Sequence, residues 1–88
     1  MRIIVLYRPD SEHARATEDF MRDYQLRYGP TKFEVQNIDA SDGGATASLY
    51  DIQQYPAILA LREDGQLLHS WEGGEMPLMD EIAGYAFS

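Results

Sequence analysis

The sequence contains no cysteine, so disulfides, thiol chemistry and thiolate metal sites are all closed to this chain. Basic residues are few, with 7 Lys and Arg against 15 Asp and Glu, and the formal net charge is −8. A phosphate backbone or an anionic membrane repels such a chain, so we expect neither a nucleic acid nor a membrane as its partner. Apolar runs are too short for a transmembrane helix, and the apolar opening of residues 1–7 is too short for a signal peptide. These absences favour a cytoplasmic protein that needs no cofactor.

The residues that are present predict one folded domain. The 88 residues have a hydrophobic fraction of 44%, which suffices for a small two-layer core and exceeds what disordered chains contain. We therefore expect a single domain spanning residues 1–88. We expect it to be monomeric and held together by packing alone.

Two uninterrupted apolar runs predict central strands, at residues 2–7 and 57–61. A strand covered on both faces has a continuous apolar run, whereas a strand with one wet face alternates. Two further strands are predicted at residues 33–38 and 66–72. The turn Glu63-Asp64-Gly65 joins the last two strands as a hairpin, with its glycine at a position that needs a positive φ.

A long amphipathic helix is predicted between the first two strands. Pro9 ends the preceding strand, and Asp10 or Ser11 then serves as the N-cap. Glu12 lies in the positive first turn, and the helix ends at Gly29. Its apolar positions recur at helical spacing and are Ala16, Phe20, Met21, Tyr24 and Tyr28.

Two shorter helices complete the chain. The first follows a loop at residues 39–44, and its apolar stripe consists of Ala45, Leu49 and Ile52. Pro77 suits the first turn of the last helix. The inner face of that helix is formed by Leu78, Met79, Ile82, Ala83 and Ala86. The order is therefore β-α-β-α-β-β-α, an α/β fold in which helices cover both faces of a four-stranded mixed sheet.

This order resembles the thioredoxin-like superfamily in its minimal, glutaredoxin-sized form. Three local features support the resemblance: a strand-turn-helix entry at residues 7–14, a Tyr55-Pro56 step before a buried strand and charged hairpin, and the pair Gly73-Gly74 before the last helix. The resemblance covers nearly the whole chain and implies a thioredoxin-like fold.

In that family a Cys-x-x-Cys motif lies at the start of the first helix, where the helix dipole lowers the pKa of the first thiol. The corresponding residues here are Ser11-Glu12-His13-Ala14. Neither serine nor alanine forms a mixed disulfide, so dithiol–disulfide exchange is excluded. Val5 stands where thioredoxins proper have a buried acid, which directs the resemblance toward glutaredoxin-like relatives. The sequence leaves two histories open, a natural loss of the cysteines and their deliberate replacement by Ser and Ala.

The resemblance also implies a groove that holds an extended polypeptide or a thiol compound. The binding residues that it implies are Tyr7, Ser11, Glu12, His13, Tyr55, Pro56, Gly73 and Gly74. The function implied first is that of a redox-inactive relative of the thiol–disulfide oxidoreductases, without enzymatic activity as it stands. The alternatives are a non-catalytic module that binds peptides or proteins and a Ser-type glutathione-dependent enzyme.

Each of these residues also has a structural interpretation. Ser11 either activates a bound thiol or caps the helix, and capping is the more common role. His13 either acts as a base for Ser11 or lies exposed, and residues two apart on a helix do not face each other. Pro56 either follows a cis peptide bond and shapes the groove or is an ordinary edge proline.

The aromatic residues leave similar alternatives. Tyr7, Tyr55 and Trp71 form either an aromatic rim of the groove or half-buried parts of the core. Tyr55 is bulkier than the residue that the family usually has before this proline. The two histidines and their neighbouring glutamates lack the spacing of a ligand set, so we expect no metal site.

Overall fold

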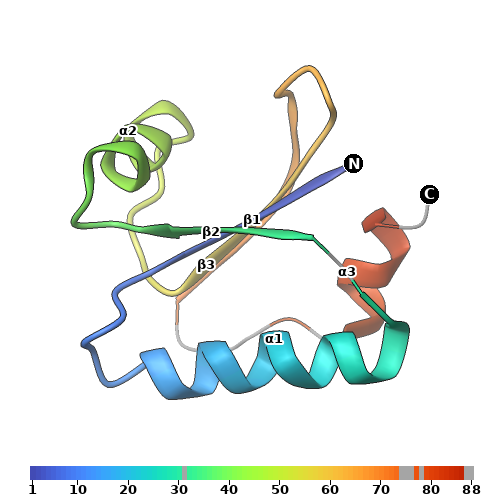
Figure 1. Ribbon diagram of the computed structural model, residues 1–88. Helices are drawn as coiled ribbons and strands as arrows, with labels where there is room; N and C mark the ends of the chain where they lie inside the picture. Colours follow the sequence, from blue (N-terminus) through green and yellow to red (C-terminus); the bar gives the residue numbers. More distant parts are fainter. Residues whose placement is uncertain (31, 74–76, 78, 87–88) are drawn as a thin grey trace.

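A computed structural model describes residues 1–30, 32–73, 77 and 79–86 of the chain (Figure 1). The element order is the one predicted from the sequence. The elements are β1 (Arg2–Tyr7), α1 (Ala14–Tyr28), β2 (Phe33–Asn37), α2 (Ser41–Leu49), β3 (Ala57–Leu61), β4 (Leu67–Glu72) and α3 (Met79–Ala86).

The four strands form one mixed sheet in the order β2-β1-β3-β4. β1 pairs in parallel with β2, whereas β1 with β3 and β3 with β4 are antiparallel pairs. The two central strands are β1 and β3, and both are buried along nearly their whole length. This burial explains their uninterrupted apolar sequences and confirms the predicted mixed sheet.

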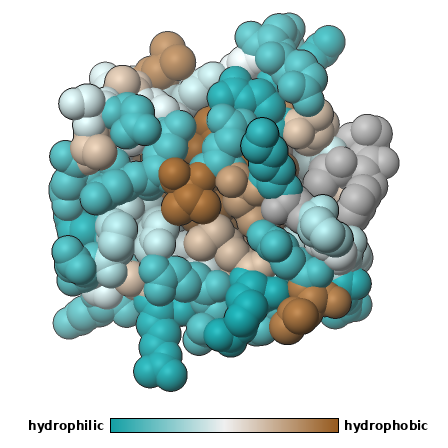
Figure 2. All heavy atoms as spheres, viewed as in Figure 1, coloured by the Kyte–Doolittle hydropathy of each residue, from teal (hydrophilic) through white to brown (hydrophobic). Residues whose placement is uncertain are grey.

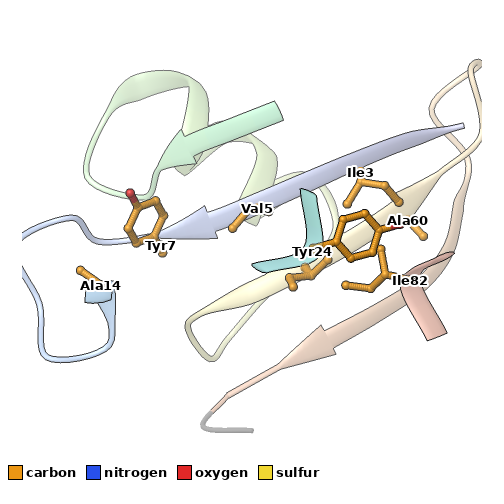
Figure 3. Packing of buried hydrophobic residues seen from close by; sticks show 8 residues of the cluster. Ile3, Val5, Tyr7, Ala14, Tyr24, Ala60 and Ile82 are labelled. Atoms are coloured by element: carbon orange, nitrogen blue, oxygen red, sulfur yellow. The ribbon is translucent and has the colours of Figure 1, made fainter. Parts of the chain in front are cut away.

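The helices lie on both faces of the sheet, with α1 and α3 on one side and α2 on the other (Figure 1). Side chains of a strand alternate between the faces, so Ile3, Val5 and Tyr7 pack toward α1 and α3. Figure 3 shows that the buried ring of Tyr24 lies among Ile3, Ala60 and Ile82. One core therefore joins α1, α3 and the sheet.

The second core, on the α2 side, is built differently from the sequence prediction. The predicted stripe is wrong, because Ala45 is exposed, Leu49 is 74% exposed and the buried Ile52 follows the helix. The buried positions of α2 are Gly43 and Ala47.

The physical reason is a close backbone contact. A Cβ atom at Gly43 would lie 2.0 Å from the carbonyl oxygen of Asn37, so only glycine permits this approach to the end of β2. The glycine pair predicted as a loop is therefore part of α2, which begins at Ser41.

The start of α1 also differs from the prediction. The helix begins at Ala14, and its N-cap position is His13, which makes no side-chain capping bond. Ser11 and Glu12 precede the helix, so the expected N-cap and the acidic first turn are both wrong. Thr17 is buried in place of Ala16. Its hydroxyl can be buried because it donates a hydrogen bond to the His13 carbonyl at 2.9 Å.

The last helix begins at Met79, so the prediction that Pro77 lies in its first turn is wrong. Other predictions hold. Gly65 has a φ of 93° in the hairpin turn, as expected. Ile82 is fully buried on the inner face of α3, with Met79 and Ala83 packed beside it. Leu78, Gly74 and the side chain of Ala86 lie outside the described part of the chain. Among the described helices, none combines the length and apolarity that crossing a membrane requires.

Candidate functional site

The predicted site lies where β1 ends and β3 begins. The register pairs Leu6 with Ala57, and Ala57 with Glu72, so Tyr7, Pro56 and Gly73 follow or precede paired residues at one end of the sheet. The Tyr55-Pro56 peptide bond is cis. Pro56 is buried, and its carbonyl accepts a hydrogen bond from the Gly73 N–H at 3.0 Å.

Residues 8–13 form a closed turn around the main chain of Arg8. The Arg8 carbonyl accepts hydrogen bonds from the Ser11 N–H at 3.1 Å and from the Ser11 hydroxyl at 2.5 Å. The Arg8 N–H donates to the Nε2 atom of His13 at 3.1 Å. The side chains of Ser11 and His13 are therefore both engaged with the main chain of Arg8.

This arrangement excludes the catalytic pairing of Ser11 with His13. The acceptor nitrogen of a neutral imidazole is the one that removes a proton, and Nε2 of His13 already accepts from Arg8. The Ser11 proton is donated to a carbonyl, which is no base. The serine is thus neither a helix cap nor an activated nucleophile.

The Arg8 side chain fastens the same turn to the segment after β2. Its guanidinium donates to both carboxylate oxygens of Asp39, from Nε at 2.8 Å and from Nη2 at 3.1 Å. This hydrogen bonding holds the pKa of the Asp39 carboxyl below its ordinary value. The sequence analysis missed this pair, although residues that follow two adjacent parallel strands always meet at the same edge of a sheet.

Tyr7 belongs to the core. The residue is 6% exposed, and its hydroxyl donates to the Glu18 carboxylate at 2.7 Å. Burial first, and then this hydrogen bond, raise the pKa of Tyr7 to about 12. Its hydroxyl is therefore committed inside the fold.

Of the two alternatives for Tyr7, Tyr55 and Trp71, a rim of the groove or parts of the core, the contacts favour the second. Tyr55 is half-buried on the α2 side, and its hydroxyl donates to the Ile52 carbonyl at 3.2 Å. Trp71 packs on the other face, with its ring centroid 4.4 Å from that of His69 and 5.7 Å from that of Tyr85. The structural interpretation of these aromatic residues is the one that the contacts support.

The segment before Pro56 is tied to the end of β4. The Glu72 carboxylate accepts hydrogen bonds from the N–H groups of Gln53 at 2.9 Å and Gln54 at 3.4 Å. Gly73 has a φ of 90°, and a Cβ atom there would lie 2.6 Å from the Gln54 side-chain oxygen. Glycine is thus required at this position by both conformation and space.

The main chain of Tyr55 is the free part of this segment. Neither its N–H nor its carbonyl forms a hydrogen bond with any of the residues that the structure describes. Ser11 and His13 lie on the neighbouring turn, and Glu12 there is exposed. This end of the sheet therefore offers unpaired main-chain groups beside a rigidly held proline.

A cleft lies at the opposite end of the sheet. It has a volume of about 430 Å³ and is lined by Met1, Arg2, Lys32, Glu34 and Glu63. Arg2 binds both oxygens of the Glu34 carboxylate, at 2.8 and 2.9 Å, and the terminal ammonium of Met1 pairs with Glu63. No residue of the predicted site lines this cleft. Among the described residues, no group of three His, Asp or Glu side chains is placed to hold a metal ion.

No family model and no curated protein matches the sequence. Among solved structures, the chain is similar to thioredoxin 1 from the thermophilic eubacterium Thermosipho africanus, with a TM-score of 0.66. The sequence identity is 9%, and the match covers 97% of this chain and 89% of that one. The fold is therefore thioredoxin-like. At a sequence identity of 9%, the similarity is evidence for the fold and not for the function.

Proposed function

We propose that this chain is a redox-inactive relative of the thiol–disulfide oxidoreductases, in which Ser11 and Ala14 occupy the two cysteine positions. The thioredoxin-like fold supports this relationship, and the absence of cysteine excludes the parent chemistry. The observation that carries the proposal is the closed turn around Arg8. Ser11 and His13 both bond to its main chain, so neither side chain is left free for chemistry at the two proposed cysteine positions.

The function that remains for such a chain is binding. We assign it to the main-chain N–H and carbonyl of Tyr55, which face an extended polypeptide as a short added strand. Peptides that bind in this way gain affinity from main-chain hydrogen bonds, and neighbouring side chains then select the sequence. Glu12, which is exposed, and the His13 ring lie on the neighbouring turn and flank the peptide on that side.

The glutathione-dependent alternative receives no support from the contacts. A serine that activates a bound thiol must donate its proton to that thiol, whereas Ser11 donates to the Arg8 carbonyl. Reduced glutathione is therefore expected to leave the amide resonances of Ser11, His13 and Tyr55 unchanged.

A nuclear magnetic resonance titration tests the binding proposal. Linear peptides are first selected from a random cysteine-free library against the whole chain, and a selected peptide is then added to the ¹⁵N-labelled protein. We expect shifts at the amides of Tyr55 and Gly73. The amide of Gly65, in the distant hairpin turn, serves as the internal control and should not move.

A substitution at the flanking glutamate sharpens the test. Glu12 is exposed and precedes α1, so the substitution Glu12→Lys should leave the fold intact. It should change only the selectivity for charged peptides. Selection of peptides that shift other amides and leave Tyr55 unchanged would refute the assignment. Failure to select any peptide would refute it as well.

A further inference from the structure

The outer edge of β2 is an unpaired edge of the sheet. Figure 1 views the molecule from this side, with β2 in front of β1. The Ile38 N–H donates to the Tyr7 carbonyl at 3.2 Å, which fixes the direction of the alternating main-chain groups. Residues 34 and 36 turn their N–H and carbonyl groups toward β1, so Val35 turns both of its groups outward.

Val35 makes this edge apolar at its centre. Its side chain is 50% exposed, and its pairing with Val5 places it on the α1 side of the sheet. Figure 2 shows apolar atoms gathered near the middle of this face, where β2 passes above α1, with hydrophilic atoms around them. β2 contains no proline, and its register with β1 is unbroken. Two devices that usually protect an edge strand, a proline and a β-bulge, are thus absent from β2, and its one charged side chain, Glu34, is bound by Arg2.

The opposite edge of the sheet differs in these respects. β4 pairs with β3 through a register shift next to Leu61, and it exposes His69 and Glu72. Irregular pairing and charged side chains both discourage the addition of another strand. The edge with the regular register and the exposed valine at its centre is therefore the one at β2.

We propose that the β2 edge pairs with the β2 edge of a second copy of this chain, antiparallel, about a two-fold axis at Val35. The two valines then face each other and exchange main-chain hydrogen bonds. With this register, Glu34 faces Gln36 of the partner subunit, and Phe33 faces Asn37 of the partner subunit. No like charges are directly opposed, so the strand is complementary to itself.

The charges around β2 favour the antiparallel arrangement. Lys32 precedes the strand and has no ion pair with the part of the chain that the structure describes. Asp42 follows the strand, so antiparallel pairing brings the Lys32 end of one copy toward the Asp42 end of the other. The carboxylates nearest the strand are already neutralised, Glu34 by Arg2 and Asp39 by Arg8. These ion pairs reduce the repulsion at this edge between two chains of charge −8.

Sedimentation equilibrium of the whole chain tests this proposal. A pairing of two short strands is small, so we expect a dissociation constant between about 10 μM and about 1 mM. Added NaCl should strengthen the association, because it screens the repulsion between two acidic chains. A chain that stays monomeric to about 1 mM in high salt would overturn the proposal.

Two matched lysine substitutions locate the interface. Val35→Lys opposes two cations across the two-fold axis and should weaken the association at least several-fold. Leu49→Lys makes the same change at a residue that is 74% exposed on α2, beside Tyr50, which bonds to the β3–β4 hairpin at Gly65. The second variant should associate like the unchanged chain. Equal association of both variants would overturn the proposal.

Amide exchange of the unchanged chain tests the same point without substitution. The Val35 N–H should become more protected from hydrogen exchange as the protein concentration rises. The Ile38 N–H, which is bonded to Tyr7 within the chain, should keep the same protection. Association that leaves Val35 equally exposed at all concentrations would place the contact elsewhere and contradict the pairing.

Discussion

At each end of β1 an arginine donates two hydrogen bonds to one carboxylate. Arg2 binds Glu34, which lies on β2, and Arg8 binds Asp39, which follows β2. At the amino end of β1 the pair lies on paired strands, and its side chains are 35% and 33% exposed. At the carboxyl end the pair lies on the loops that follow the strands, and its side chains are 51% and 56% exposed.

The two ends differ in what is left unpaired. The amino end has the cleft, but most of the charged groups in it are bound to each other. The carboxyl end has the Ser11 and His13 side chains engaged around Arg8, whereas the main chain of Tyr55 bonds to none of the residues that the structure describes. The cleft at the amino end of β1 is therefore best explained as structural. The candidate binding site is at the carboxyl end, where main-chain groups of Tyr55 are available.

The largest loss of stability is expected from a substitution at the carboxyl end of the sheet, at Gly43. Gly43→Ala places a Cβ atom 2.0 Å from the Asn37 carbonyl oxygen, so α2 must move away from the end of β2. We expect a loss of about 3 kcal/mol in the free energy of unfolding, measured with urea. Gly44→Ala is the control, because its nearest contact would be an ordinary 3.7 Å. That variant should be stabilised by about 0.5–1 kcal/mol, and similar losses in both would contradict the packing described.

A smaller effect is expected at Tyr7. Tyr7→Phe removes the hydrogen bond to Glu18 and should lower the free energy of unfolding by about 1 kcal/mol at neutral pH. The pKa of Tyr7 is raised from 10.0 to about 12 in the fold, so its stabilisation is complete below pH 10 and is lost as the pH rises toward 12. Urea unfolding at pH 9 and pH 11 should therefore show a steeper alkaline loss in the unchanged chain than in Tyr7→Phe. Equal slopes would contradict the burial of this hydroxyl.

The smallest effects compare the two arginines directly. Arg2→Met should cost about 0.5–1 kcal/mol, a value limited by the partial exposure of the ion pair. Arg8→Met should cost less, because its pair is more exposed. The hydrogen bond from Arg2 lowers the pKa of Glu34 from its ordinary 4.5, so this stabilisation is present above pH 4.5 and is lost as the pH falls through the lowered pKa. Acid unfolding should thus distinguish Arg2→Met from the unchanged chain, and an equal acid dependence would contradict the assignment.

Much of the fold could be predicted from the sequence because packing dictates it. Continuous apolar runs identified β1 and β3, and the Glu63-Asp64-Gly65 turn identified the hairpin. The face of α2 could not be predicted, because periodicity assumes that large apolar side chains make the contact. Here the contact is made by the backbone at Gly43.

The candidate site was predicted less completely. The sequence predicted Ser11 as a helix cap and His13 in the first helical turn, whereas α1 begins only at Ala14. Local hydrogen bonds to Arg8 compete with helix formation there, and propensity alone does not reveal which conformation wins. Arg8 and Asp39 were missed because their pairing depends on strand register, which becomes visible only once the sheet is assembled.

The most direct test of the proposed redox-inactive site is the double variant Ser11→Cys/Ala14→Cys. A thiol at position 11 lies before the first residue of α1, where it gains little from the helix dipole. We expect its thiol to have an ordinary pKa of about 8.5, close to that of a short peptide with the same substitutions, and to reduce a protein disulfide slowly. A thiol pKa of about 7 or lower, together with efficient reduction, would show that the site is still tuned for redox chemistry and would contradict the proposal.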